Sequence, residues 1–124
     1  MYEIFVKTHF SSAHYLRDYP GKCEFLHGHN WEVEAGVRVE KLDSLGMGID
    51  FRDLKSAVAV IMKELDHRNL NEHPAFQDVN PSSEHIAAYV YRRLGEELKD
   101  FSGVSPAFVT VYETPGSGVR YFGE

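Results

Sequence analysis

Side chains that bind metals or move protons lie close together in one short segment of the chain. Residues 23–30 read Cys-Glu-Phe-Leu-His-Gly-His-Asn, which places one thiol and two imidazoles within seven residues. If the backbone is extended across His27-Gly28-His29, both imidazoles point to the same side of the strand and can bind one ion. A third imidazole, His14, lies upstream, and three neutral imidazoles are a ligand set that suits zinc. Three protein ligands leave a fourth position open, as in catalytic zinc sites.

The same residues are also compatible with an ordinary loop. The chain has seven histidines, so one His-x-His pair is expected by chance. By itself, Cys23 is more typical of a small buried apolar residue than of a reactive thiol. These residue types alone therefore support a metal site and an unspecialised segment about equally.

An ordered series of motifs, however, resembles the 6-pyruvoyl-tetrahydropterin synthase family, including its bacterial branch of 6-carboxy-tetrahydropterin synthases. Phe-Ser-x-Ala-His at residues 10–14 precedes Cys-x-x-x-His-Gly-His at residues 23–29. Four later segments are similar to family motifs and follow in the family's order: Met47–Leu54, Leu65–Asn71, Asn80–Glu84 and Val111–Thr114. The series covers nearly the whole chain and is far more specific than any single motif.

The resemblance implies a metal site and a proton relay. It implies that Zn²⁺ is bound by three imidazoles, those of His14, His27 and His29. Cys23 matches the catalytic cysteine of the family, and Asp66 and His67 match the pair that works with it. A carboxylate bonded to an imidazole raises its basicity and fixes its tautomer, which prepares a histidine for acid–base work. Without the resemblance, a cation near a helix C-terminus is the simpler explanation of this pair.

The resemblance also implies a set of substrate-binding residues. Glu113 matches the glutamate that holds the pterin ring, since a carboxylate accepts two parallel hydrogen bonds from the amino and imide N–H groups of the ring. Taken alone, a glutamate at a strand end is more often solvated. Ser82, Ser83 and Glu84 match a further motif that contacts the substrate, and these serines also suit the start of a helix.

Two departures from the family pattern bear on the reaction. The Cys-x-x-x-His spacing resembles the carboxy-tetrahydropterin branch, whereas the pyruvoyl-forming animal branch has a longer gap. Glu24 directly follows Cys23, and relatives that cleave the side chain to the folate precursor have a glutamate here. Glu24 is therefore either a second base or a solvated loop charge. His85 replaces an asparagine that is common in relatives, so the contact which that asparagine makes is not carried over to this chain.

The function implied by the resemblance is that of a zinc-dependent lyase. The expected activity is 6-carboxy-5,6,7,8-tetrahydropterin synthase, which acts on 7,8-dihydroneopterin triphosphate in queuosine biosynthesis. Formation of 6-pyruvoyl-tetrahydropterin and cleavage to 6-hydroxymethyl-dihydropterin are alternatives within the family. A pterin-binding module without turnover and a metal-free Cys-His hydrolase are alternatives outside these activities.

Length and composition favour a single soluble domain and disfavour nucleic-acid binding and membrane insertion. The chain of 124 residues is long enough for one core, so residues 1–124 are expected to form a single tetrahydropterin-synthase-like domain. A formal charge of −6, with 13 basic and 19 acidic side chains, disfavours nucleic-acid binding. No apolar run approaches the roughly 20 residues that span a bilayer. The absence of a secretory signal and the single cysteine predict a cytoplasmic protein.

Apolar periodicity predicts the elements that must position these residues. Strands are predicted at residues 2–9, 31–39, 107–113 and 119–122, with loop structure over residues 10–29, and Gly103 and Pro106 are expected to mark the exit from the second helix. A helix capped by Asp50 should end near Asp66-His67, and a second should start after Pro81 with Ser82 or Ser83 as its cap. His27 and His29 lie an even number of residues before Trp31, the first of the alternating apolar residues. They are therefore expected to face inward unless a bulge intervenes near Gly28.

This order of elements, ββααββ, predicts an α+β fold in which a four-stranded antiparallel sheet has two helices on one face. The two sheet edges need a partner or a cover. The resemblance implies the tunnelling fold (T-fold), in which sheets of three subunits join into a barrel. A homo-oligomer, either a trimer or a dimer of trimers, is therefore expected.

Overall fold

The computed structural model describes residues 1–21 and 24–123, so the predicted catalytic base, Cys23, lies outside the described residues. The principal elements follow in the predicted order ββααββ. Their bounds are β1 Tyr2–His14, β2 His27–Val39, α1 Phe51–Leu65, α2 Ser83–Glu97, β3 Val104–Thr114 and β4 Ser117–Tyr121. Two short 3₁₀ helices, Leu70–Glu72 and Pro74–Phe76, lie between α1 and α2.

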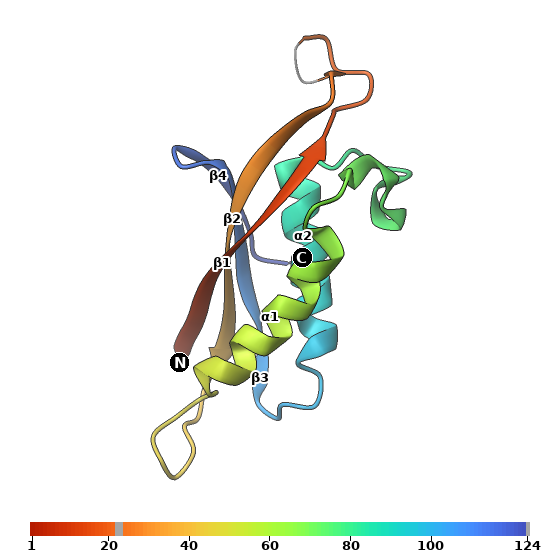
Figure 1. Cartoon of the computed structure of the whole chain (residues 1–124). Coiled ribbons are helices and arrows are strands. Elements are labelled where there is room, and N and C mark those ends of the chain that lie inside the picture. Colours follow the sequence, from red (N-terminus) through yellow and green to blue (C-terminus); the bar gives the residue numbers. More distant parts are fainter. Residues whose placement is uncertain (22–23, 124) are drawn as a thin grey trace.

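The strands form one antiparallel sheet in the order β1-β2-β3-β4, and both helices lie on the same side of it (Figure 1). The alternating residues of β2 from Trp31 to Val39 are buried beneath the helices. The apolar stripe of α1 and the buried face of α2 complete this core. The predicted α+β class and the arrangement of two helices on one face are therefore confirmed. Among the helices that the structure describes, none is long and apolar enough to cross a lipid bilayer.

β1 and β2 are longer than the sequence pattern predicts. β1 continues to His14 and β2 begins at His27, so part of the predicted loop is paired strand. The register runs without interruption from Tyr2↔Val39 to His14↔His27. No bulge occurs at Gly28, and the inward direction predicted for His27 and His29 is confirmed.

β3 begins at Val104, before its predicted start at residue 107, so Pro106 lies inside the strand and not in the connection that leads out of α2. Pro106 pairs with Val37 next to a register shift between Gly36 and Val37. A proline can lie in a strand where the ladder is irregular, since its missing N–H then removes no regular hydrogen bond.

The predicted helix caps are confirmed. Asp50 precedes α1 and its carboxylate accepts a hydrogen bond from the N–H of Arg52 at 2.8 Å. Ser82 precedes α2 and its hydroxyl accepts from the N–H of His85 at 3.2 Å. Each cap satisfies an N–H group that has no partner within its own helix, and so fixes where the helix begins.

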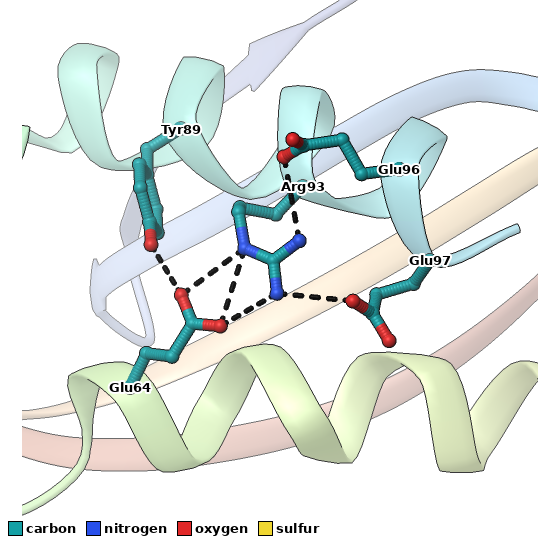
Figure 2. A network of polar contacts seen from close by, with 5 residues as sticks. All are labelled: Glu64, Tyr89, Arg93, Glu96 and Glu97. Carbon is teal, nitrogen blue, oxygen red and sulfur yellow. Dashed lines mark hydrogen bonds and ion pairs between the residues drawn. The ribbon is translucent and has the colours of Figure 1, made fainter. Parts of the chain in front are cut away.

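A polar network ties the two helices together on the side away from the sheet core (Figure 2). The guanidinium of Arg93 on α2 lies 2.6 Å from the carboxylate of Glu64 on α1 and 3.1 Å from that of Glu97. Tyr89 donates its hydroxyl to Glu64. Burial and the neighbouring Glu64 raise the pKa of Tyr89 to about 12, so this phenol stays protonated as the donor.

Candidate metal centre and active site

Three histidine side chains converge where β1 ends and β2 begins. The ring centroids of His14 and His27 are 4.6 Å apart, those of His14 and His29 are 5.3 Å apart, and those of His27 and His29 are 4.8 Å apart. The strand register explains this convergence, because His14 pairs with His27 and residue 12 pairs with His29. Glu113, near the end of β3, joins the group, and one potential ligand atom from each of the four residues lies within 4.8 Å of the others.

Backbone carbonyls set the orientation of two of the rings. His14 Nδ1 lies 2.7 Å from the carbonyl oxygen of Pro81, and His27 Nδ1 lies 2.7 Å from that of Phe25. A carbonyl accepts but cannot donate, so in both rings Nδ1 carries the proton and Nε2 carries the free lone pair. Metal-binding histidines are commonly oriented in this way by a hydrogen bond from their other ring nitrogen.

The buried ring nitrogens fit a metal ion. Among the described residues, His14 Nε2 and His29 Nε2 have no hydrogen-bond partner although both atoms are buried. Buried polar atoms are almost always satisfied, so two such nitrogens beside each other indicate a ligand that the protein itself does not supply. A set of three imidazoles next to a carboxylate matches the donor preference of Zn²⁺.

The local electrostatics favour neutral rings, which metal binding requires. Burial lowers the pKa of His14, and the neighbouring His27 lowers it further against the opposing effect of the Pro81 carbonyl. Burial also lowers the pKa of His29, although the negative charge of Glu113 acts in the opposite direction. These two imidazoles are therefore neutral at pH 7.

Glu113 lies at the edge of the histidine cluster. Its Oε1 is 3.0 Å from His29 Nε2, but the two groups are not aligned as a hydrogen bond. Ser83 at the start of α2 donates its hydroxyl to the other carboxylate oxygen at 3.4 Å. This carboxylate can thus serve either as an oxygen ligand or as the acceptor for a ring that binds beside the metal.

Asp66 and His67 are in contact with each other at the end of α1. Asp66 Oδ2 lies 2.9 Å from His67 Nδ1. Adjacent side chains on a helix diverge by about 100°, but α1 ends at Leu65 and His67 has a left-handed backbone with φ 54°. A hydrogen bond from the N–H of Ser11, followed by that from His67, lowers the pKa of Asp66. No contact joins this pair to the histidine cluster within the described ranges.

The other predicted site residues lie at the periphery. Ser82 is the cap of α2 and Glu84 is exposed in its first turn, so Ser83 is the member of this motif that reaches Glu113. Glu24 is exposed, and its backbone N–H donates to the carbonyl of Gly21 at 3.3 Å.

Sequence reasoning missed two groups that support the site. One is the carbonyl of Pro81, which no sequence pattern could identify because it lies 67 residues from the His14 ring it orients. The other is Ser12, a hydroxyl on the buried side of β1 between Phe10 and His14. A polar residue at a buried position of an alternating strand is a signal that could have identified it.

Comparison with known proteins gives a consistent result. A family model described as 6-pyruvoyl tetrahydropterin synthase matches residues 3–124. The 6-carboxy-5,6,7,8-tetrahydropterin synthase of Synechocystis sp. is 35% identical over 98% of this chain and 94% of its own length. The 6-pyruvoyl tetrahydrobiopterin synthase of Homo sapiens is 39% identical over 84% of this chain and 72% of its own. The solved 6-pyruvoyl tetrahydropterin synthase of Caenorhabditis elegans superposes with a TM-score of 0.86 at 28% identity, covering 99% of this chain and 96% of that chain.

Proposed function

This chain belongs to the 6-pyruvoyl tetrahydropterin synthase family, and from that membership we propose that it is a zinc-dependent lyase that converts 7,8-dihydroneopterin triphosphate to 6-carboxy-5,6,7,8-tetrahydropterin. This reaction would serve the queuosine pathway in the cytoplasm. The observation that carries the proposal is the convergence of His14, His27 and His29, in which the buried Nε2 atoms of His14 and His29 have no hydrogen-bond partner among the described residues.

The choice of product rests on similarity and on one motif. The Synechocystis relative, which is named for the carboxy product, aligns with nearly the whole of both chains. The spacing of Cys23 and His27 is that of the carboxy-tetrahydropterin branch. Both observations favour the carboxy product over the pyruvoyl product.

Each part of the site has a role in the proposed mechanism. A zinc ion bound by the three imidazoles would polarise the side-chain hydroxyls of the substrate and acidify the adjacent C–H groups. Cys23 takes a proton as the base, for which its thiol must be ionised. Asp66 accepts a hydrogen bond from Nδ1–H of His67, which leaves Nε2 of this exposed ring to exchange protons. Glu113 holds the pterin ring, assisted by Ser83.

Product analysis tests the proposal directly. Purified protein with about one zinc per chain is incubated with 7,8-dihydroneopterin triphosphate, and the pterins are separated and identified by mass. We expect 6-carboxy-tetrahydropterin from the wild type and none from Cys23→Ala, with equal metal content in the two proteins. The absence of every tetrahydropterin or hydroxymethyl product from the metal-loaded wild type would reject the enzyme assignment in favour of a pterin-binding module.

Two sibling reactions are distinguished by the same assay. The 39% identity to the human 6-pyruvoyl tetrahydrobiopterin synthase makes the pyruvoyl product the second candidate. Cleavage to 6-hydroxymethyl-dihydropterin would require another base, and Glu24 is the candidate for it. Under our proposal Glu24→Gln retains the carboxy product, whereas loss of a hydroxymethyl product in this variant would assign the cleavage reaction.

We also propose that the chain acts as a homo-oligomer, a trimer or a dimer of trimers. The sheet ends in two edge strands, β1 and β4, and the outward backbone groups of an edge strand can pair with another copy. The exposure of His67 supports a site that a neighbouring subunit completes.

A further inference from the structure

We propose that Ser12 is a positioning residue for the Asp66–His67 pair: its buried hydroxyl holds the turn that bears this pair against the strand that bears His14. The inference rests on the proposed function in so far as Asp66 and His67 take part in proton transfer. It assigns the precise placement of that pair to a residue whose hydroxyl bonds, among the described residues, to the backbone of Leu65 and Arg68.

Ser12 lies on the side of β1 that faces the helices. It is 7% exposed and lies between Phe10 in the core and the metal-site residue His14. Its partner across the sheet is His29. An apolar residue would be expected at such a position, so a serine here needs hydrogen-bond partners within the protein.

The hydroxyl of Ser12 contacts the backbone on both sides of the Asp66–His67 pair. It donates to the carbonyl of Leu65, the last residue of α1. It accepts from the N–H of Arg68 at 3.1 Å. A hydroxyl is the smallest side-chain group that can donate and accept at once, so one atom fixes both ends of the two-residue turn. The Leu65 carbonyl is among those left unpaired at a helix C-terminus, and Ser12 satisfies it.

The turn between these two contacts has an unfavourable backbone conformation. His67 has φ 54°, in the left-handed region that residues other than glycine seldom adopt. Such a conformation persists only where the surrounding structure fixes it. The N–H of His67 donates to the carbonyl of Ser11 at 2.6 Å, and the N–H of Ser11 donates to Asp66 Oδ1 at 2.8 Å. The Ser12 hydroxyl completes this set at both ends of the turn.

The orientation of the His67 ring depends on this turn. The side chain of His67 is 82% exposed, and within residues 1–21 and 24–123 its ring bonds to Asp66 alone. The position of the ring is therefore set by the backbone of the turn and by Asp66, and not by packing against other side chains. Loss of the Ser12 hydroxyl would leave the Leu65 carbonyl and the Arg68 N–H without a partner and allow the turn to relax, which separates His67 from the carboxylate.

The test compares Ser12→Ala with Ser11→Ala. The Ser11 hydroxyl donates to Asn30 at 2.7 Å on the other side of the strand, while its contacts to Asp66 and His67 use the backbone, so Ser11→Ala is the matched control. Each variant is measured for zinc content, for kcat and KM, and for the ring resonances of His67 by NMR at one fixed pH. We expect Ser12→Ala to keep its zinc, to lower kcat by about tenfold to a hundredfold with KM changed less than about twofold, and to change the His67 ring resonances because the ring moves away from Asp66. Ser12→Thr, which retains the hydroxyl, should restore the wild-type resonances, and Ser11→Ala should match the wild type throughout.

A Ser12→Ala protein that folds, binds zinc and shows the wild-type His67 ring resonances would overturn the inference. If this variant fails to fold, hydrogen exchange in the wild type decides: the Arg68 amide should be protected, and exchange at the rate of an unstructured peptide would overturn the inference. The ring resonances and the exchange rate do not depend on turnover. A wild type that forms no pterin product would therefore reject the proposed function while these two measurements still decide the role of Ser12.

Discussion

At the level of single residues, the site depends on which nitrogen of each imidazole is free. The carbonyls of Pro81 and Phe25 hold the Nδ1 protons of His14 and His27, so the ring nitrogens that remain can bind a metal without prior rearrangement. Burial, which lowers the pKa of His14, keeps protons from competing with the ion near neutral pH.

Replacing one imidazole should therefore abolish stable metal binding. We expect the zinc content of His29→Ala to fall from about one ion per chain to well below it. The affinity for zinc should drop by more than about a hundredfold, because only two of the three imidazole ligands remain. His9→Ala is the matched control, since this exposed histidine lies on β1 and faces away from the cluster. Elemental analysis after dialysis measures the stoichiometry, and full retention of zinc by His29→Ala would contradict the assignment.

The role of Glu113 can be separated from that of the histidines. We expect Glu113→Gln to keep its zinc and to bind a pterin about tenfold to a hundredfold more weakly, because hydrogen bonds to a charged acceptor contribute roughly 1.5–3 kcal/mol. Isothermal titration with a pterin and elemental analysis measure the two properties in the same sample. Loss of zinc with unchanged pterin affinity would instead identify Glu113 as a fourth metal ligand.

At the level of elements, the site is held by the ends of helices and strands. α2 begins at Ser83 beside Glu113, and α1 ends at Leu65 beside the Asp66–His67 turn. Arg93 and Glu64 join the two helices near the C-terminal end of α1 (Figure 2). This network thus stabilises the element from which the turn extends.

A double-mutant cycle with Glu64→Gln and Arg93→Met should measure this link. We expect a coupling energy of about 1–3 kcal/mol at pH 7, because the side chains of Glu64 and Arg93 are 29% and 17% exposed and are bonded through three pairs of atoms. Denaturant unfolding of the four proteins gives the value. A coupling near zero would show that water replaces the contact without loss.

The same pair predicts a dependence of stability on pH. Its hydrogen bonds to Arg93 lower the pKa of Glu64 in the folded protein below the ordinary value near 4.3. The stabilisation is therefore fully present above that ordinary value and is lost as the pH falls through the lower folded pKa. The difference in unfolding free energy between wild type and Glu64→Gln should be constant from pH 7 to about pH 5 and shrink below about pH 4. A difference that grows on acidification would contradict this.

At the level of the whole molecule, part of the β1 edge of the sheet is already bonded to another segment of the chain. The N–H groups of Ser11 and Ala13 on β1 already bond to the turn after α1. Amides alternate in direction along a regular strand, so that of Lys7 points to the same free side, away from β2. The earlier part of β1 therefore offers backbone groups to another chain.

Lys7→Pro should prevent assembly without unfolding the chain. Proline removes the outward N–H of Lys7 but none of the bonds between β1 and β2, and edge strands tolerate it for this reason. We expect native mass spectrometry to find a multiple of three chains for the wild type and for the control Lys7→Ala, and a monomer with an unchanged circular dichroism spectrum for Lys7→Pro. A monomeric wild type would reject the proposed assembly, and an assembled Lys7→Pro would show that this part of β1 is not the contact.

The sequence by itself determined the elements and the faces they bury. Alternation over residues 31–39, the apolar stripe of α1 from Leu54 to Leu65 and the caps Asp50 and Ser82 depend on residues a few positions apart, so the sequence indicates them directly. Phe51, whose spacing also fits this stripe, is instead 57% exposed. The same parity argument gave the inward direction of His27 and His29, because side chains alternate along an uninterrupted strand.

The tertiary structure decided which distant groups meet. The predicted loop over residues 10–29 gave no indication that residues 10–14 pair with β2, and that register brings His14 to His27. Other contacts also join segments more than 50 residues apart. They are made by the Pro81 carbonyl with His14, by the His67 turn with Ser11, and by the Ser12 hydroxyl with Leu65 and Arg68. Such contacts leave no periodic pattern in a single sequence, because they depend on how strands pair and where a helix ends in space.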